Sequence, residues 1–273
     1  MQQEFDAVAR EYDSTFSQTA VGSLLRARVR ACFGHIKTLQ NKVGTALEIN
    51  CGTGEDAIWL AQQGWKVIAT DASPEMIAVA MAKIETSGLS GQAQARICSF
   101  ADLPQLPESN FDLIFSNFGG LNCISPSELE ALGPVILQKL KPGGRLIAVV
   151  MSRFCWWEIL YFLWKGNSKE AFRRFDEKPE NAALDPQTRV KTWYYAPNEL
   201  EKRLRCHSNA SSGKFKKSDL QPIGLWLPPS YLNPFFEKRP RLLKRLNDWE
   251  QKRSPSWLAF AGDHFLICLE KEA

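Results

Sequence analysis

The sequence predicts an α/β protein with an open, mainly parallel sheet, and three observations lead to this prediction. Between residues 44 and 151, short β-rich runs alternate with helix-like segments, which is typical of βαβ units. A glycine-rich stretch joins the first β-rich run to the first helix. With 273 residues, 44% of them hydrophobic, the chain is long enough to bury a substantial core and is not expected to be disordered.

Five strands and three helices are expected in this region. The strands are predicted at 45–50, 66–70, 93–99, 111–116 and 145–151, and the helices at 55–63, 74–85 and 126–140. Ser73 and Ser125 are predicted helix N-caps, each followed by a proline at the first helical position. Glu128 completes a capping box with Ser125. The string Lys141-Pro142-Gly143-Gly144 is expected to end the third helix and turn into the next strand.

The pattern changes after residue 151. We expect an aromatic-rich helix at 154–165, a loop at 166–188, a strand at 190–195 and a helix at 198–205. A strand at 220–227, a basic helix at 239–253 and a strand at 264–269 follow. The chain is therefore interpreted as a single domain over 1–273: N-terminal helices (1–43), a core (44–151), an inserted cap (152–214), and C-terminal strands with a helix (215–273).

Composition narrows the class of protein. The net charge of +4 is too mild to indicate a nucleic-acid binder. The charge is unevenly distributed, because residues 1–150 hold 12 basic and 15 acidic side chains whereas residues 151–273 hold 22 basic and 15 acidic ones. The seven cysteines form no C-x-x-C pair, which predicts neither a disulfide framework nor a metal site. The N-terminus does not resemble a signal peptide, and the longest apolar run has eleven residues, where a membrane span needs about 20. A cytoplasmic protein is expected, and contact of its basic half with a membrane surface is left open.

The most informative stretch runs from Glu48 to Ala57. Glycines let a backbone approach a ligand closely, and free N–H groups at a helix start bind oxygen atoms. Asp71, at the end of the next strand, is placed to accept hydrogen bonds from a ribose diol. Together these features predict a nucleoside-containing ligand at the carboxyl ends of the strands. The spacing G-x-G-x-x-A also fits NAD or FAD, but the acids Glu48, Glu55 and Asp56 disfavour a pyrophosphate and are tolerable for a ligand with a cationic centre.

The string E-x-N-C-G-T-G at 48–54 resembles motif I of the class I S-adenosylmethionine-dependent methyltransferases. The resemblance continues at 71–76 (DASPEM), 111–114 (FDLI), 140–144 (LKPGG) and in the Phe5-Asp6 and Tyr12-Asp13 pairs. It departs from the family pattern at Asn50, where a glycine is usual; asparagine tolerates the left-handed backbone region. The resemblance implies a Rossmann-like, seven-stranded sheet with helices on both faces and a cap inserted after the fifth strand.

The resemblance also implies a set of residues around S-adenosylmethionine. Glu48, Asn50, Cys51, Gly52 and Gly54 would surround its methionine part, with Tyr12 and Arg26 closing over the carboxylate. Asp71 would bind the ribose, and Ala72, Met76, Ser99 and Phe100 would contact the adenine. Asn117, Phe118 and Leu121 would line the sulfonium end.

The predicted reaction is transfer of a methyl group to a small molecule. Aromatic residues of the cap suggest an acceptor with apolar or aromatic character, and they are Phe154, Trp156, Trp157, Tyr161, Phe162, Trp164, Trp193, Tyr194 and Tyr195. A sulfonium methyl is already activated, so no catalytic residue can be named; candidate bases are Glu158, Tyr194, Tyr195, His207, Tyr231 and His264. Nucleic acid is not an expected partner, because Ser116-Asn117-Phe118-Gly119 stands where nucleic-acid amino-methylating relatives have N-P-P-Y. A monomer or a homodimer is expected.

Two other functions remain open at this point. One is an NAD(P)-dependent oxidoreductase, and the other is a non-catalytic regulatory protein that binds S-adenosylmethionine.

Overall fold

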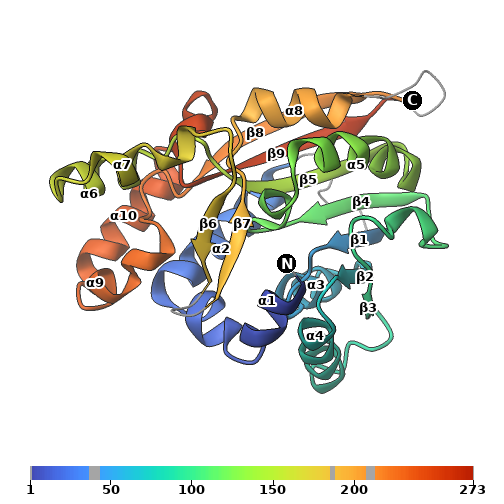
Figure 1. Ribbon diagram of the computed structural model, residues 1–273. Coiled ribbons are helices and arrows are strands. Elements are labelled where there is room, and N and C mark those ends of the chain that lie inside the picture. The colour runs from blue at the N-terminus through green and yellow to red at the C-terminus, as the bar shows by residue number, and fades with distance from the viewer. Residues whose placement is uncertain (1, 37–43, 185–187, 207–212, 273) are drawn as a thin grey trace.

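A seven-stranded sheet forms the centre of the computed structural model, which describes residues 2–36, 44–184, 188–206 and 213–272 (Figure 1). The strand order is β3-β2-β1-β4-β5-β9-β8. Strands β1 to β5 run parallel to their neighbours, while β9 is antiparallel to both β5 and β8. The predicted α/β sheet is therefore confirmed. Its strands are β1 (Thr45–Ile49), β2 (Lys66–Asp71), β3 (Ala93–Ile97), β4 (Phe111–Ser116), β5 (Leu140–Met151), β8 (Phe215–Ile223) and β9 (His264–Lys271).

Helices cover both faces of the sheet, as expected. Successive strand residues point to opposite faces, so Ala46 of β1 packs in one hydrophobic core and Leu47 in the other. The first core includes side chains from α2 (Ala20–His35), α3 (Glu55–Gln62), α4 (Pro74–Thr86), α9 (Asn233–Glu237) and α10 (Pro240–Lys252). The second includes side chains from α5 (Pro126–Lys139) and α8 (Pro197–Arg205).

The predicted helix caps form beside the carboxyl ends of the strands. The Ser73 hydroxyl accepts the Met76 N–H at 3.1 Å and begins α4. The Ser125 hydroxyl accepts the Glu128 N–H at 3.3 Å, and the Glu128 carboxylate accepts the Ser125 N–H at 2.7 Å. This reciprocal pair is a capping box, so both helix starts are held at the edge of the sheet where a ligand is expected.

The segment between β5 and β8 is more structured than predicted. It contains α6 (Trp156–Trp164), α7 (Ser168–Ala171), a 3₁₀ turn (Arg173–Phe175) and a hairpin of β6 (Glu180–Ala183) with β7 (Arg189–Thr192). The expected loop at 166–188 was therefore wrong for α7, the 3₁₀ turn and β6, each too short to leave a periodic signal. The hairpin extends from the sheet toward α1 (Gln2–Val8) (Figure 1).

Several strand boundaries also differ from the prediction; the strand expected at 190–195, for example, is β7 and ends at Thr192. The Pro-Gly-Gly string after α5 lies inside β5, where the pairing with β4 shifts register. Strand β8 ends at Ile223 instead of continuing to residue 227. It is the last strand in the sheet order, and an edge strand tolerates both its charged residues and Pro222. Among the described helices, none is both long and apolar enough to cross a membrane.

Candidate functional site

A cavity of about 510 Å³ lies at the carboxyl ends of β1, β2 and β4. Thirteen of the fifteen residues predicted to surround the cofactor line it. They are Tyr12, Arg26, Glu48, Asn50, Cys51, Gly52, Asp71, Ala72, Met76, Ser99, Phe100, Asn117 and Phe118. The open α/β sheet thus gathers segments that are far apart in the sequence into one wall, as the position of the glycine loop indicates.

Gly54 and Leu121 are not among the residues that line this cavity. Gly54 is the N-cap of α3 with φ +78°, and a Cβ there would lie 2.9 Å from the Ala80 side chain of α4. Its place in the loop is explained by backbone conformation and by close packing. Leu121 is fully buried in the second hydrophobic core, so its side chain does not form part of the cavity wall.

Asn50 replaces the usual first glycine of the loop without losing its conformation. Its φ is +59°, in the left-handed region that asparagine tolerates. The side chain adds a tether, because its amide donates to the Asn117 carbonyl at 2.9 Å and accepts from the Ser116 hydroxyl at 2.6 Å. Asn50 therefore fastens the end of β1 to the end of β4, which a glycine at this position cannot do.

Asp71 links the glycine loop to the start of α4. One carboxylate oxygen accepts the Gly52 N–H and the other the Ser73 N–H, both at 2.9 Å. Burial raises the pKa of this carboxyl, and these backbone hydrogen bonds work in the opposite direction. Each carboxylate oxygen has a second lone pair, so the pair remains able to accept two hydroxyl groups from the cavity.

The end of the cavity near β2 and β3 is mostly apolar, with Ala72, Met76, Phe100 and Leu103 in its wall. Ser99 is the polar group there. Its hydroxyl donates to the Asp102 carboxylate at 2.6 Å, which leaves the lone pairs of the hydroxyl oxygen available to accept. This end is suited to a planar ring whose amino group donates one hydrogen bond.

Glu48 supplies an unpartnered acid at the opposite end. Its side chain is 2% exposed, and its Oε2 has no hydrogen-bond partner within the described residues. Burial and the negative charge of Asp56 raise the pKa of this carboxyl well above its usual value, although Arg26 opposes the shift. An acceptor left buried without a partner is costly, so the position is best explained by a cationic group of a ligand.

The other acids of the loop are already neutralised. Asp56 pairs with Arg26 and with Arg30, and it accepts the Asn117 amide at 2.7 Å. Glu55 pairs with Lys83. Of the three acids expected to disfavour a pyrophosphate, only Glu48 therefore remains without a basic partner within the described residues.

Arg26 lines the cavity, but its guanidinium already binds several protein groups. Besides Asp56, it donates to the Ser17 hydroxyl at 3.2 Å, and its guanidinium lies 5.2 Å from the centre of the Phe118 ring. Its Nε has no partner within the described part of the chain. Its predicted contact with a ligand carboxylate is therefore limited to the donors that this network leaves free.

The N-terminal segment covers the cavity through contacts that the sequence analysis missed. Asp13 accepts the Thr53 hydroxyl at 2.6 Å and pairs with Lys83 at 2.7 Å, and Asp6 accepts the Ser73 hydroxyl at 2.5 Å. Leu184, which directly follows β6, reaches the same cover, because it packs with α1 and Met76 in one apolar cluster. The only sequence signals for these contacts were the Phe5-Asp6 and Tyr12-Asp13 pairs.

The expected acceptor region does not form as predicted. None of the nine cap aromatics lines the cavity. Trp164 is exposed, while other α6 aromatics pack on the segments that follow β8, as in the Tyr161–Tyr231 contact at 6.0 Å. The wall beyond Phe118 is built from residues that carried no clear sequence signal. They are Gly119, Gly120, Cys123, Ile124, Glu128, Met151, Ala182, Ala183, Leu184, Val190 and Thr192.

The candidate bases are also placed elsewhere. Glu158, Tyr194, Tyr195, Tyr231 and His264 are not part of the cavity wall, and His207 lies outside the described residues. The Tyr195 hydroxyl donates to the Ile124 carbonyl at 2.9 Å. His264 reaches the site only indirectly, through an edge-to-face contact with Phe118 at 5.4 Å between ring centres.

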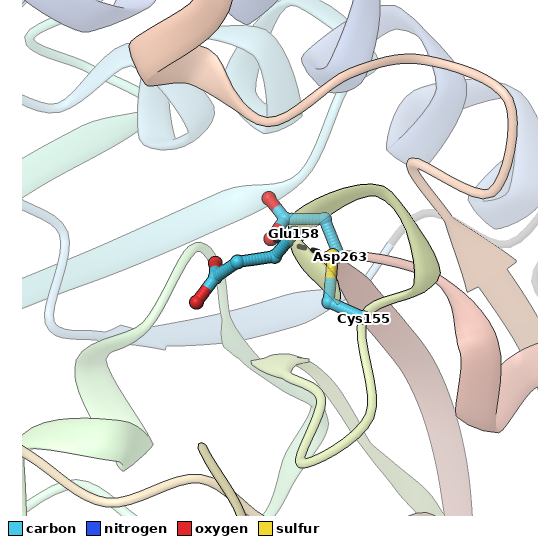
Figure 2. A group of neighbouring side chains, drawn as sticks. All are labelled: Cys155, Glu158 and Asp263. Carbon is cyan, nitrogen blue, oxygen red and sulfur yellow. Dashed lines mark hydrogen bonds between the residues drawn. The ribbon is translucent and has the colours of Figure 1, made fainter. Parts of the chain in front are cut away.

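A separate buried cluster joins the cap to the sheet. Cys155, Glu158 and Asp263 lie close together (Figure 2), an arrangement that suits a cation. Arg174 already provides the positive charge: its guanidinium donates to Glu158 at 2.6 Å and to Asp263 at 2.8 Å. Arg173 adds a second contact to Glu158 at 2.8 Å. The cluster is therefore an ion-pair network that holds the start of the cap.

Comparison with known proteins finds similarity for the part of the chain that contains the glycine loop. Residues 46–144 match a family model described as a methyltransferase domain. An uncharacterized methyltransferase of Synechocystis is 31% identical over 39% of this chain and 47% of its own length. A demethylmenaquinone methyltransferase of Thermus thermophilus is 30% identical over 53% of this chain and 63% of its own. The chain thus spans about half to three fifths of these relatives.

A solved structure supports the same fold over the whole chain. The complex of DhpI with S-adenosylhomocysteine superimposes with a TM-score of 0.55 at 19% identity, covering 100% of this chain and 95% of that one. At this identity the likeness describes the fold.

Proposed function

Because residues 46–144 match a family model described as a methyltransferase domain, we propose that the protein transfers a methyl group from S-adenosylmethionine to a small, largely apolar molecule. The observation that carries the proposal is one cavity whose polar residues follow the order of the strands. Ser99 follows β3, Asp71 ends β2, and the unpartnered Glu48 lies in β1. Beyond Phe118, which follows β4, the acceptor end of the cavity is walled by apolar side chains and by residues of the β6–β7 hairpin.

The cavity residues fit the cofactor group by group. Asp71 would accept hydrogen bonds from the ribose hydroxyls, the Ser99 oxygen would accept one from the adenine amino group, and Glu48 would bind the ammonium of the methionine part. When bound, S-adenosylmethionine supplies a sulfonium methyl group that is already activated for attack. The protein then has to align the acceptor atom with that methyl and keep water away.

The residues beyond Phe118 are suited to this alignment. Cys123, Ile124, Met151 and Val190 give this end an apolar wall, and the hairpin together with α1 closes the cavity from outside. Burial raises the pKa of the Cys123 thiol to about 12 and that of the Tyr12 hydroxyl to about 12. Both groups are therefore protonated near neutral pH, and the favoured acceptors are molecules whose nucleophilic atom needs no strong base.

The proposal is tested by incubating the protein with S-adenosylmethionine and separate pools of apolar carboxylic acids, phenols, thiols and amines. Formation of S-adenosylhomocysteine with one pool, and its loss in Asp71→Ala, is the expected result. Binding of S-adenosylhomocysteine without turnover on any pool would instead support a regulatory protein. Turnover of NAD(P) with a substrate would support the oxidoreductase and overturn the proposal.

A further inference from the structure

A second feature of the molecule lies away from the cavity, on α6 and α10. Trp156, Leu160, Leu163 and Trp164 follow one another at i, i+4, i+7 and i+8 and therefore share one side of α6. Leu160 and Leu163 are exposed, and Trp164 is 82% exposed. Isolated apolar residues on a surface are ordinary, but several on one helix face indicate a binding surface.

The apolar side of α6 continues onto α10 through a row of tryptophans. The ring centre of Trp156 lies 6.1 Å from that of Trp226, which lies 5.6 Å from that of Trp249 on α10. The Trp226 indole N–H donates to the Arg253 carbonyl at 2.7 Å, so the row is held to the end of α10. Both helices lie at the same end of the molecule (Figure 1).

Helix α10 brings positive charge to this surface. Leu242, Arg245, Trp249 and Lys252 recur at i, i+3, i+7 and i+10 and form one exposed stripe. Residues 224–261 hold seven basic and three acidic side chains. One of the acids, Glu250, is buried and accepts the Gly224, Trp226 and Leu227 N–H groups. All seven basic side chains are exposed, and within the described residues none pairs with a carboxylate.

We propose that this surface docks onto an anionic lipid bilayer. We call it the α6–α10 face, and its members are Trp156, Leu160, Leu163, Trp164, Trp226, Leu242, Arg245, Trp249 and Lys252. Tryptophan rings favour the headgroup region, leucines enter the acyl boundary, and lysine and arginine bind anionic headgroups. The face places all three kinds of side chain together.

Other occupants fit the surface less well. A second copy of the chain would oppose its basic stripe to a like-charged one, and like charges across an interface disfavour association. A nucleic acid would match the charge and could stack on the tryptophans, but the exposed leucines beside them offer it neither stacking nor hydrogen bonds. An acidic protein surface is the remaining alternative, and the experiment below separates it from a bilayer.

The test is flotation of the full-length protein with vesicles of phosphatidylcholine alone or of phosphatidylcholine with phosphatidylserine. The expected result is binding to the anionic vesicles, a blue shift of tryptophan fluorescence on binding, and weakening of both by salt. Each basic residue near an anionic membrane surface contributes to the free energy of binding. Reversing two of these charges in R245E/K252E is therefore expected to lower the binding constant by ~30-fold or more. L163S/W164S is expected to remove binding and to reduce the blue shift.

The matched control is K66E/K216E, which changes the net charge equally. Lys66 begins β2 and Lys216 lies in β8, and both are exposed. This variant is expected to bind anionic vesicles nearly as well as the wild type, and thermal unfolding checks that all variants fold. Failure of the wild type to bind, equal binding to both kinds of vesicle, or equal loss in the control would each overturn the proposal. No vesicle binding would leave an acidic protein as the partner to seek.

Discussion

Replacement of Glu48 by glutamine is expected to stabilise the protein and to weaken its binding of S-adenosylhomocysteine. The carboxyl is 2% exposed and has an unpartnered oxygen. Glutamine keeps a polar side chain at this position but cannot ionise, so the variant avoids the cost of burying a charge and should be more stable than the wild type at pH values above the unfolded pKa of Glu48. A hydrogen bond to a charged group contributes about 1.5–3 kcal/mol, so the dissociation constant for S-adenosylhomocysteine should rise by roughly 10- to 150-fold.

The pH dependence has a definite sign. The folded-state pKa of Glu48 is raised above its unfolded value of about 4.3. The folded protein therefore holds this proton more tightly than the unfolded chain, and stability without ligand falls as pH rises from the unfolded to the folded pKa. Binding of the ammonium group needs the ionised carboxylate, so affinity rises over the upper part of the same range. Glu48→Gln removes both contributions.

Urea unfolding of the free protein and calorimetric titration with S-adenosylhomocysteine, both between about pH 5 and pH 8, measure the two effects. Glu108→Gln is the matched control, because Glu108 pairs with Arg96 and is not part of the cavity wall. The amino group of the ligand also titrates near this range, but it does so equally in all variants. Unchanged affinity in Glu48→Gln would show that this acid does not bind the ligand.

Three further predictions follow from single contacts. Asp71→Ala should weaken S-adenosylhomocysteine binding by roughly 1–3 kcal/mol in calorimetry, and an unchanged dissociation constant would contradict the ribose assignment. Arg174→Met leaves Asp263 buried without its arginine and leaves Glu158 with Arg173 alone, so urea unfolding should show a loss of about 3–5 kcal/mol; a loss under about 1 kcal/mol would contradict the network. Val190→Trp should raise the acceptor KM more than tenfold (about 1.4 kcal/mol) with the S-adenosylhomocysteine affinity unchanged. An equal weakening of S-adenosylhomocysteine binding would contradict the assignment of acceptor and cofactor to separate parts of the cavity.

Much of the cofactor half of the cavity could be predicted from the sequence because its signals are local. Asn50, Gly52 and Asp71 lie at strand ends that hydrophobic runs and turn residues mark clearly, and parallel topology then brings those ends together. The exceptions have physical reasons. Leu121 lies near the site in sequence, but the short 3₁₀ turn that contains it directs its side chain into the core.

The acceptor half could not be predicted in the same way. Strands β6 and β7 have four residues each, too few to show alternation, and their pairing depends on the chain folding back across the sheet. The aromatic helix at 154–165 was correctly predicted as a helix. Its side chains were expected in the cavity, yet Trp156 and Tyr161 pack against Trp226 and Tyr231, residues that are 70 positions later in the sequence. Such contacts depend on tertiary structure and leave no local pattern.

Thermal unfolding in the presence of S-adenosylmethionine, S-adenosylhomocysteine, NAD and NADP, measured in parallel, decides which cofactor the cavity binds. A ligand at 100 times its dissociation constant adds about 2.7 kcal/mol to the free energy of unfolding, which is a shift of several degrees for a chain of this size. The two adenosyl compounds are expected to stabilise the protein, and NAD and NADP are expected to leave its unfolding temperature unchanged. Stabilisation by NAD or NADP alone would contradict the assignment of Asp71, Ser99 and Glu48 to S-adenosylmethionine, and with it the proposed methyl transfer.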